Sequence, residues 1–175
     1  RPMVIGEVLN PAGTESVRFA EIRAVHTTNQ KFNTYEQSNS AGLFSLNLPA
    51  DGTYQISANP PLGVNANYGI SDSITVTVTN GLPSLVSINI RLRNANVSGL
   101  VSGPNGAVAP NNWLSVSESR TGTYLEPTFE GPLTDEDGRY SLYLPTGAYG
   151  ITPSSDYGNT GGVATTPKSC VVGSN

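Results

Sequence analysis

Three segments of the first half of this 175-residue chain recur in its second half, in the same order and with similar spacing. The matching pairs are 4–8 (VIGEV) with 97–101 (VSGLV), 41–49 (AGLFSLNLP) with 137–145 (DGRYSLYLP), and 52–56 (GTYQI) with 147–151 (GAYGI). Such self-similarity indicates an internal duplication. The sequence therefore predicts two modules of one type, with the boundary between residues 93 and 94.

The repeated pattern has the period of a β-strand. Gly42 and Gly138 stand where a tight turn needs a positive φ, which glycine reaches at little cost. The residues after each glycine alternate between apolar and polar, which places the apolar ones on one face. These apolar residues are Phe44, Leu46 and Leu48 in the first module and Tyr140, Leu142 and Leu144 in the second. Tyr54 and Tyr149 follow at the start of the next strand, and we expect them to pack as large corner residues.

The composition suppresses helices, because the chain has 19 Gly, 13 Pro and long stretches rich in Ser, Thr, Asn and Val. We predict an all-β fold of two tandem antiparallel β-sandwich modules, 1–93 and 94–175. The expected strands of the first are 4–9, 19–26, 34–37, 43–48, 53–58, 73–79 and 84–92. Those of the second are 96–102, 113–118, 128–132, 139–144, 148–153 and 163–172. Either the second module lacks a counterpart of strand 84–92, or segment 163–172 takes its place.

The charge of the chain argues against nucleic acid as a partner. Charged residues make up 13% of the chain, the net charge is −4, and the nine Lys and Arg residues are scattered singly rather than clustered in a basic stripe. No apolar run is long enough to span a membrane. The low-lysine composition, rich in Thr, Asn and Ser, is typical of secreted bacterial proteins. We expect an extracellular or cell-surface location, with any secretion signal upstream of Arg1.

The motif at 134–149 (TDEDGRYSLYLPTGAY), together with the Val-x-Gly-x-Val pattern at 97–101, resembles the carboxypeptidase regulatory-like family. The resemblance covers nearly all of both modules, and it extends to the B-type repeats of Gram-positive surface adhesins. It implies transthyretin-like (prealbumin-like), Ig-like sandwiches that serve as accessory or stalk modules, since catalysis in the enzymes that name the family lies in a separate domain. The first module departs from the motif, with Ser-Ala-Gly at 40–42 in place of Glu-Asp-Gly at 136–138.

The resemblance to adhesin repeats also raises the question of an isopeptide bond. In those relatives a lysine on the first strand can link to an asparagine on the last. The present chain contains only Lys31 and Lys168, and neither lies in the first strand of a module. We therefore expect no such bond.

The acidic cluster Asp135, Glu136 and Asp137 is the strongest candidate for a metal site. Calcium prefers several carboxylate and carbonyl oxygens within a tight loop. The alternative is a hairpin turn without metal, because short acidic side chains bond their own backbone in turns. The cluster lacks the alternating ligands and closing glutamate of an EF-hand loop. Apart from this calcium alternative, the sequence predicts no cofactor.

Nothing in the sequence points to catalysis. His26 is the only histidine, and we expect it to be exposed at the end of a strand. Cys170 is the single cysteine, which excludes an internal disulfide, and it is expected to behave as a small buried hydrophobe. Trp113 is expected to fill the core of the second module. The chain is therefore predicted not to be an enzyme.

Three functions are compatible with these features. The leading one is a structural spacer or adhesion-stalk segment, stiffened by the short connection 93–95. The second is a module that binds carbohydrate or an extracellular protein through loops 60–71 and 119–130, with Tyr68 and Tyr124 as contact residues. The third is an accessory domain of a secreted hydrolase. The expected partners are neighbouring domains of the parent chain and, in the second case, the bound ligand.

Overall fold

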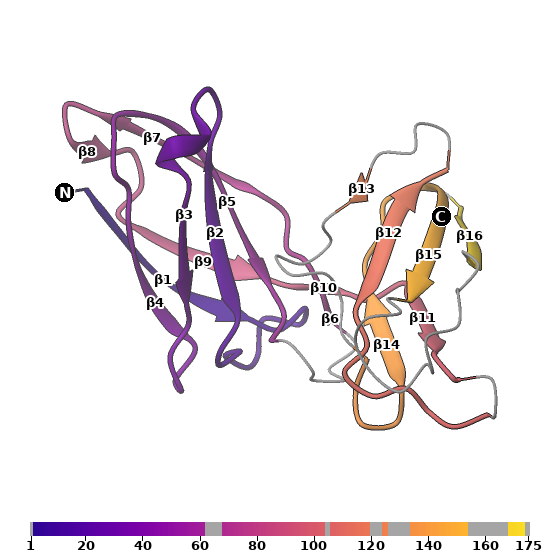
Figure 1. Cartoon of the computed structure of the whole chain (residues 1–175). Coiled ribbons are helices and arrows are strands. Elements are labelled where there is room, and N and C mark those ends of the chain that lie inside the picture. Colours follow the sequence, from indigo (N-terminus) through magenta and orange to yellow (C-terminus); the bar gives the residue numbers. More distant parts are fainter. Residues whose placement is uncertain are drawn as a thin grey trace. The chain divides into compact units, whose positions relative to one another are not determined.

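The computed structural model describes residues 2–61, 68–103, 106–119, 124–125, 134–153 and 168–173. They fall into two compact units: the first holds 2–61 and 70–93, and the second holds the described residues of 62–69 and 94–175. Within the described ranges the elements are strands apart from one 3-10 turn, η1 (Gln30–Phe32), as the all-β prediction requires (Figure 1). No helix of the described residues is long and apolar enough to cross a membrane.

The first unit is a sandwich of two sheets. Its strands are β1 (Met3–Leu9), β2 (Glu21–His26), β3 (Thr34–Gln37), β4 (Leu43–Asn47), β5 (Gly52–Asn59), β7 (Ile74–Thr79), β8 (Leu82–Pro83) and β9 (Ser87–Arg91). The smaller sheet has the order β4-β1-β9, and the larger has the order β3-β2-β5-β7-β8 (Figure 1).

Alternate residues of both sheets form the core of this unit. The buried side chains of the smaller sheet are Val4, Val8, Phe44, Leu46, Ile88 and Ile90, and those of the larger sheet are Ile22, Ala24, Tyr54, Ile56, Ala58, Val76 and Val78. Burial of one large apolar side chain contributes about 1.5–3 kcal/mol, so this core is the main source of stability. The face predicted for Phe44, Leu46 and Leu48 is confirmed.

One strand pair of the sandwich is parallel. β1 and β9 run in the same direction, with Ile5 beside Ser87 and Leu9 beside Arg91. A parallel pair cannot be joined by a tight hairpin and needs a long crossover connection. Here the connection includes all the strands from β2 to β8, so the β1–β9 pairing joins the first strand of the unit to its last.

The second unit has a smaller set of described strands. They are β11 (Val97–Leu100), β12 (Leu114–Glu118), β13 (Tyr124–Leu125), β14 (Arg139–Leu142), β15 (Gly147–Pro153) and β16 (Lys168–Val172). β11 pairs with β14, and a second sheet has the order β13-β12-β15-β16. The two short strands β6 (Tyr68–Gly69) and β10 (Arg93–Asn94) pair with one another. The core of the unit consists of Val101, Ala109, Leu114, Val116, Leu142, Leu144, Tyr149 and Ile151.

The backbone hydrogen bonds show which strands of the two units correspond. Val8 N–H donates to Gly42 O at 2.9 Å, and Val101 N–H donates to Gly138 O at 2.8 Å. β11 and β14 are therefore the counterparts of β1 and β4. In the larger sheets, β12-β15-β16 repeats the order β2-β5-β7.

This correspondence bears on one of the two alternatives for the end of the second module, the replacement of its last strand by segment 163–172. Segment Lys168–Val172 pairs with β15, as β7 pairs with β5 in the first unit. It does not lie beside β11, so the expectation that it could replace the last strand is wrong. Among the described residues, the second unit has no counterpart of β9.

Several strand boundaries differ from the sequence-based expectation. Phe19 adopts a φ of 58°, which ends extended structure there, and β2 begins at Glu21. β8 was missed, although Asn80-Gly81, with φ values of 51° and 75°, forms the turn that joins it to β7. Trp113 is half-buried, because Leu114 and Val116 occupy the inward positions of β12. The expected strand 128–132 lies outside the described residues.

His26 is buried, at 7% exposure, and the expectation of an exposed histidine is wrong. Its ring packs edge-on against Phe32 and Tyr54. The Nδ1 atom accepts hydrogen bonds from the backbone N–H groups of Thr28 and Asn29, at 3.3 and 3.1 Å. The chain after β2 folds back over the ring, and a periodic pattern of residues does not reveal that.

Tyr54 and Tyr149 occupy the same position in the two units, as predicted for corner residues. The Tyr54 hydroxyl donates to Ala50 O at 2.9 Å, and the Tyr149 hydroxyl donates to Pro145 O at 2.8 Å. Burial raises the pKa of both phenols above the ordinary value of 10.0. For Tyr54, the hydrogen bond with Ala50 lowers the pKa in part and the charge of Asp51 raises it further. For Tyr149, the charge of Glu118 adds to the rise in pKa.

These pKa shifts predict an alkaline loss of stability. A phenol whose pKa is raised in the folded state contributes stability that is complete below the unfolded value and is lost as the pH rises through the folded value. We expect the free energy of unfolding, measured in urea, to fall above about pH 10. In the Tyr54→Phe/Tyr149→Phe variant the free energy of unfolding at pH 7 should be lower by about 1 kcal/mol per site. Its free energy of unfolding should also fall less steeply as the pH rises above 10. Tyr35→Phe, at an exposed ring, is the control; an unchanged alkaline slope in the double variant would contradict this account.

Candidate functional site

The acidic cluster forms a closed turn between Asp135 and Arg139. Asp135 Oδ1 accepts hydrogen bonds from the backbone N–H groups of Asp137 and Arg139, both at 2.9 Å. Asp135 N–H donates to Arg139 O at 2.8 Å, and Gly138 has a φ of +74°. The carboxylate thus holds the turn that begins β14.

The first unit has the same turn without the charge. Asn39 Oδ1 accepts from the N–H groups of Ala41 and Leu43 at 2.9 and 3.0 Å. Asn39 N–H donates to Leu43 O at 2.8 Å, and Gly42 has a φ of +77°. A neutral amide therefore makes the contacts that Asp135 makes, and turn closure alone accounts for an oxygen-bearing side chain at both positions.

No group of three or more His, Cys, Asp and Glu side chains that could hold a metal ion occurs among the described residues. Glu136 and Asp137 are exposed. The structure brings them next to Asp135 in one turn but supplies no further acidic ligand from another described segment. Calcium binding by Asp135, Glu136 and Asp137 stays a prediction.

A buried hydroxyl precedes each turn and ties it to the neighbouring loop. Thr134 Oγ1 donates to Ala109 O at 2.6 Å and accepts from Asn112 N–H at 2.8 Å. Ser38 Oγ makes the equivalent bonds, donating to Val17 O and accepting from Ala20 N–H. Sequence analysis did not assign this role, although a hydroxyl residue directly before Asn39 or Asp135 in both halves was a usable signal.

The two tyrosines expected in ligand-binding loops lie in different sheets. Tyr68 is half-buried in β6, and Tyr124 begins β13, whose backbone pairs with β12 opposite Ser117. Residues 62–67, 120–123 and 126–130 of the expected loops lie outside the described residues. A role for Tyr68 and Tyr124 in binding remains a prediction.

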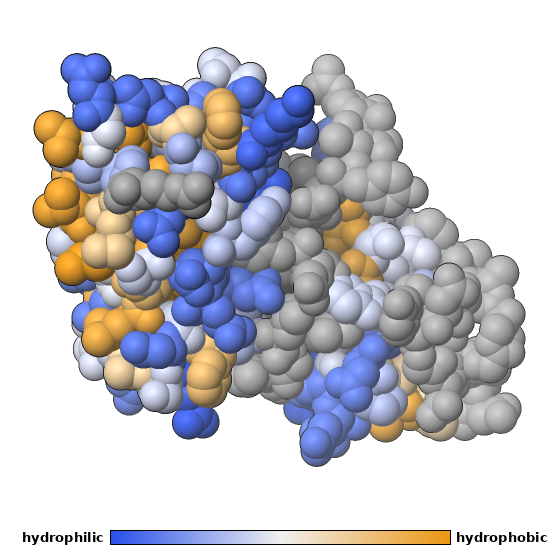
Figure 2. Space-filling model, turned by 60° about the vertical axis from the view of Figure 1, so that its left-hand side comes forward, coloured by the Kyte–Doolittle hydropathy of each residue, from blue (hydrophilic) through white to orange (hydrophobic). Residues whose placement is uncertain are grey.

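The described histidine and cysteine are not arranged for catalysis. His26 Nε2 faces Asp51 O at 3.2 Å, and its Nδ1 faces backbone N–H groups and the Thr28 hydroxyl, so both ring nitrogens are engaged in local structure. Cys170 is a free, half-buried thiol that packs against the core of the second unit. Among the residues that Figure 2 colours by hydropathy, apolar and polar ones are mixed on the face in view.

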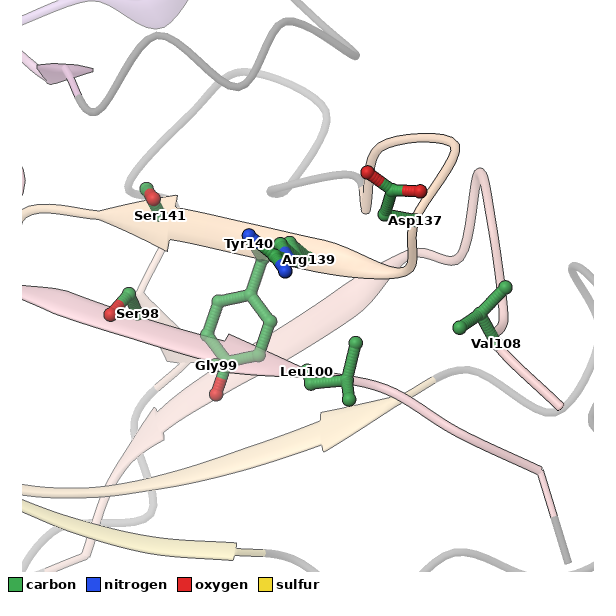
Figure 3. Close-up of a pocket in the computed structure, with 8 residues that line it drawn as sticks. All are labelled: Ser98, Gly99, Leu100, Val108, Asp137, Arg139, Tyr140 and Ser141. Carbon is green, nitrogen blue, oxygen red and sulfur yellow. The ribbon is translucent and has the colours of Figure 1, made fainter. Parts of the chain in front are cut away.

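A hollow lies on the sheet formed by β11 and β14, and sequence analysis did not predict it. Figure 3 shows the residues that line it, with the Tyr140 ring lying over Gly99. Leu100 and Val108 are 59% and 45% exposed there. Burial, and then the nearby Cys170, raise the pKa of the Tyr140 phenol, so the hydroxyl at this site is neutral and able to donate a hydrogen bond.

Comparison with known proteins finds similar solved structures but no similar sequence family. No protein-family model and no curated protein matches the sequence. Among solved structures, the chain is similar to the Bacillus anthracis TIE protein, with 17% identity over 99% of this chain and 31% of that one and a TM-score of 0.39. It is also similar to the shaft pilin SpaA from Lactobacillus rhamnosus GG, with 10% identity over 98% and 93% of the two chains and a TM-score of 0.40. For a streptococcal ancillary pilin the identity is 17% over 99% and 59%, with a TM-score of 0.40.

The matching turns lead to a direct test of the metal alternative. We expect Asp135→Asn to leave the melting temperature nearly unchanged, because the amide of Asn39 already makes the same two bonds in the first unit. Asp135→Ala and Asn39→Ala should each cost about 1 kcal/mol, since two backbone N–H groups lose their acceptor. Calorimetric melts with EDTA and with added Ca²⁺ decide between the alternatives. A calcium-dependent rise in melting temperature that Asp135→Asn/Asp137→Asn abolishes would establish the metal site instead.

Proposed function

We propose that this chain is a non-catalytic structural segment, in which two β-sandwich units in tandem act as a spacer within a larger protein. The observation that carries the proposal is that matching polar side chains of the two units hold the backbone of the same turn. Asn39 and Asp135, like Ser38 and Thr134, hold backbone groups in the same way in both units. The duplication has therefore kept the groups that build a scaffold.

The chain passes between the units three times, after residues 61, 69 and 93, and the last of these connections is short. On one side, Leu92 is buried and its N–H donates to Leu9 O at 2.9 Å. On the other side, the Asn96 side chain bonds the backbone O and N of Leu144 at 2.8 and 2.9 Å. The intervening residues 93–95 are too few to behave as a flexible coil.

We propose a cell-surface or extracellular location for the parent protein, in bacteria, with its own neighbouring domains as the immediate partners. The composition supports this, since the chain is poor in lysine and rich in Thr, Asn and Ser. We also propose kinship with the carboxypeptidase regulatory-like family. That kinship is supported by the motif at 134–149 and its partial copy in the first module.

NMR relaxation tests the spacer proposal. If the units are coupled, the amides of both should report one rotational correlation time, appropriate to the whole chain. The control carries long Gly-Ser insertions at all three crossings, after residues 61, 69 and 93, and it should show shorter correlation times that differ between the units. Independent tumbling of the units in the unmodified chain would refute the spacer.

A further inference from the structure

The turn that joins β7 to β8 (Figure 1) contains a chemically reactive dipeptide, Asn80-Gly81. The two residues adopt φ values of 51° and 75°, and both are exposed. A Cβ atom built on Gly81 would meet no described atom within 4 Å, so water has access to this turn. An asparagine followed by a glycine is the pair most prone to deamidation, because no side chain on the second residue shields its backbone nitrogen.

Deamidation uses the backbone nitrogen of Gly81 as the nucleophile. The nitrogen attacks Cγ of the Asn80 side chain, a new N–Cγ bond forms, and the bond from Cγ to Nδ2 breaks. The proton of the Gly81 N–H leaves with Nδ2 as ammonia, and the product is a cyclic succinimide. Water then opens the ring at either carbonyl, which leaves an aspartate or an isoaspartate at position 80. The reaction consumes only water, so an exposed turn has every reactant it needs.

In this structure the nucleophile is bonded to another group. Gly81 N–H donates to Asp51 Oδ1 at 2.9 Å, and Asn80 N–H donates to Oδ2 of the same carboxylate at 2.7 Å. Because the nitrogen attacks as the deprotonated amide, the bond from Gly81 to Asp51 has to break before the ring can close.

The charge of Asp51 adds to this protection. A carboxylate is far too weak a base to remove the proton of a backbone amide at neutral pH. Its negative charge also opposes the formation of a second negative charge on the nitrogen that it contacts. Hydrogen bonds to a charged acceptor are stronger than those between neutral groups. Asp51 should therefore slow the reaction and not catalyse it.

The position of Asp51 is fixed from the interior of the unit. The Tyr54 hydroxyl donates to Ala50 O at 2.9 Å and accepts from Ala50 N–H at 3.1 Å. His26 Nε2 lies 3.2 Å from Asp51 O. Tyr54 and His26 are both buried, so side chains of the core hold the backbone that presents this carboxylate to the turn.

We propose that Asn80 is a deamidation site of the first unit, and that the Asp51 carboxylate slows its modification by binding the N–H of Gly81. When that contact is lost the succinimide forms, and an isoaspartate product adds a methylene group to the backbone of the turn. Thr79 and Leu82 pair across this two-residue connection, which is matched to a backbone of normal length. Modification should therefore separate β8 from β7. This inference goes beyond the spacer function and does not depend on it.

The test follows deamidation in the full 175-residue chain at neutral pH, by mass spectrometry of its proteolytic peptides after incubation. In the folded chain Asn80 should deamidate far more slowly than in the isolated peptide of residues 77–85 (TVTNGLPSL). Asp51→Ala should raise the rate in the chain about 10-fold, because the Gly81 N–H loses its charged acceptor. Asp51→Asn keeps an acceptor oxygen without the charge and should give an intermediate rate.

Asn39→Ala is the matched control, because it too removes an oxygen that accepts two backbone N–H groups from a turn of the first unit. It should leave the rate at Asn80 unchanged, which separates a local effect of Asp51 from a general loss of stability. The proposal is overturned if Asp51→Ala leaves the rate unchanged or lowers it, since the carboxylate would then give no protection or would act as a base. It is also overturned if Asn80 deamidates as fast in the unmodified chain as in the peptide, or if Asn39→Ala raises the rate as much as Asp51→Ala does.

Discussion

One side-chain oxygen that accepts two backbone N–H groups sets the register of the smaller sheet in each unit. Asn39 supplies this oxygen before β4, and Asp135 supplies it before β14. The register places an aromatic ring opposite a glycine, Phe44 beside Gly6 and Tyr140 beside Gly99. At Gly6 a Cβ atom would lie 2.0 Å from Ile88 O and 2.6 Å from the Phe44 ring, so the glycine lets β9 and the ring approach together.

The rest of each sandwich depends on this arrangement. Because side chains alternate between the two faces of a strand, the apolar residues of β4 and β14 face the core once the turn is formed. Tyr54 of β5 and Tyr149 of β15 are buried in the same cores. The buried polar groups serve the backbone: a hydroxyl at Ser38 or Thr134, a phenol at Tyr54 or Tyr149, and the imidazole of His26. These buried polar side chains stabilise the backbone conformation, which is what a structural module requires. This use, rather than any likeness to known structures, makes a structural role the better account.

Sequence alone predicted what the repeat encodes, and it failed where contacts between distant segments decide. The alternation around Phe44 and Leu142 and the turn glycines Gly42 and Gly138 were predicted correctly, because period two and positive φ are local properties. The burial of His26 was not, since it depends on the chain folding back over the ring. The place of Lys168–Val172 beside β15 was not predicted either, because a strand pattern does not say which neighbour the strand will have.

Amide hydrogen exchange of the chain by itself tests the central claim, that the two units share one framework of turn and strand. In the first unit the amide of Ile5 should exchange slowly, because it is bonded within the β1–β9 pairing. In the second unit the amides of Val101, Asp137 and Arg139 should also exchange slowly, because they donate to Gly138 O and to Asp135 Oδ1. Fast exchange of these three amides beside a slow Ile5 would show that the second unit lacks the framework of the first and would contradict the account.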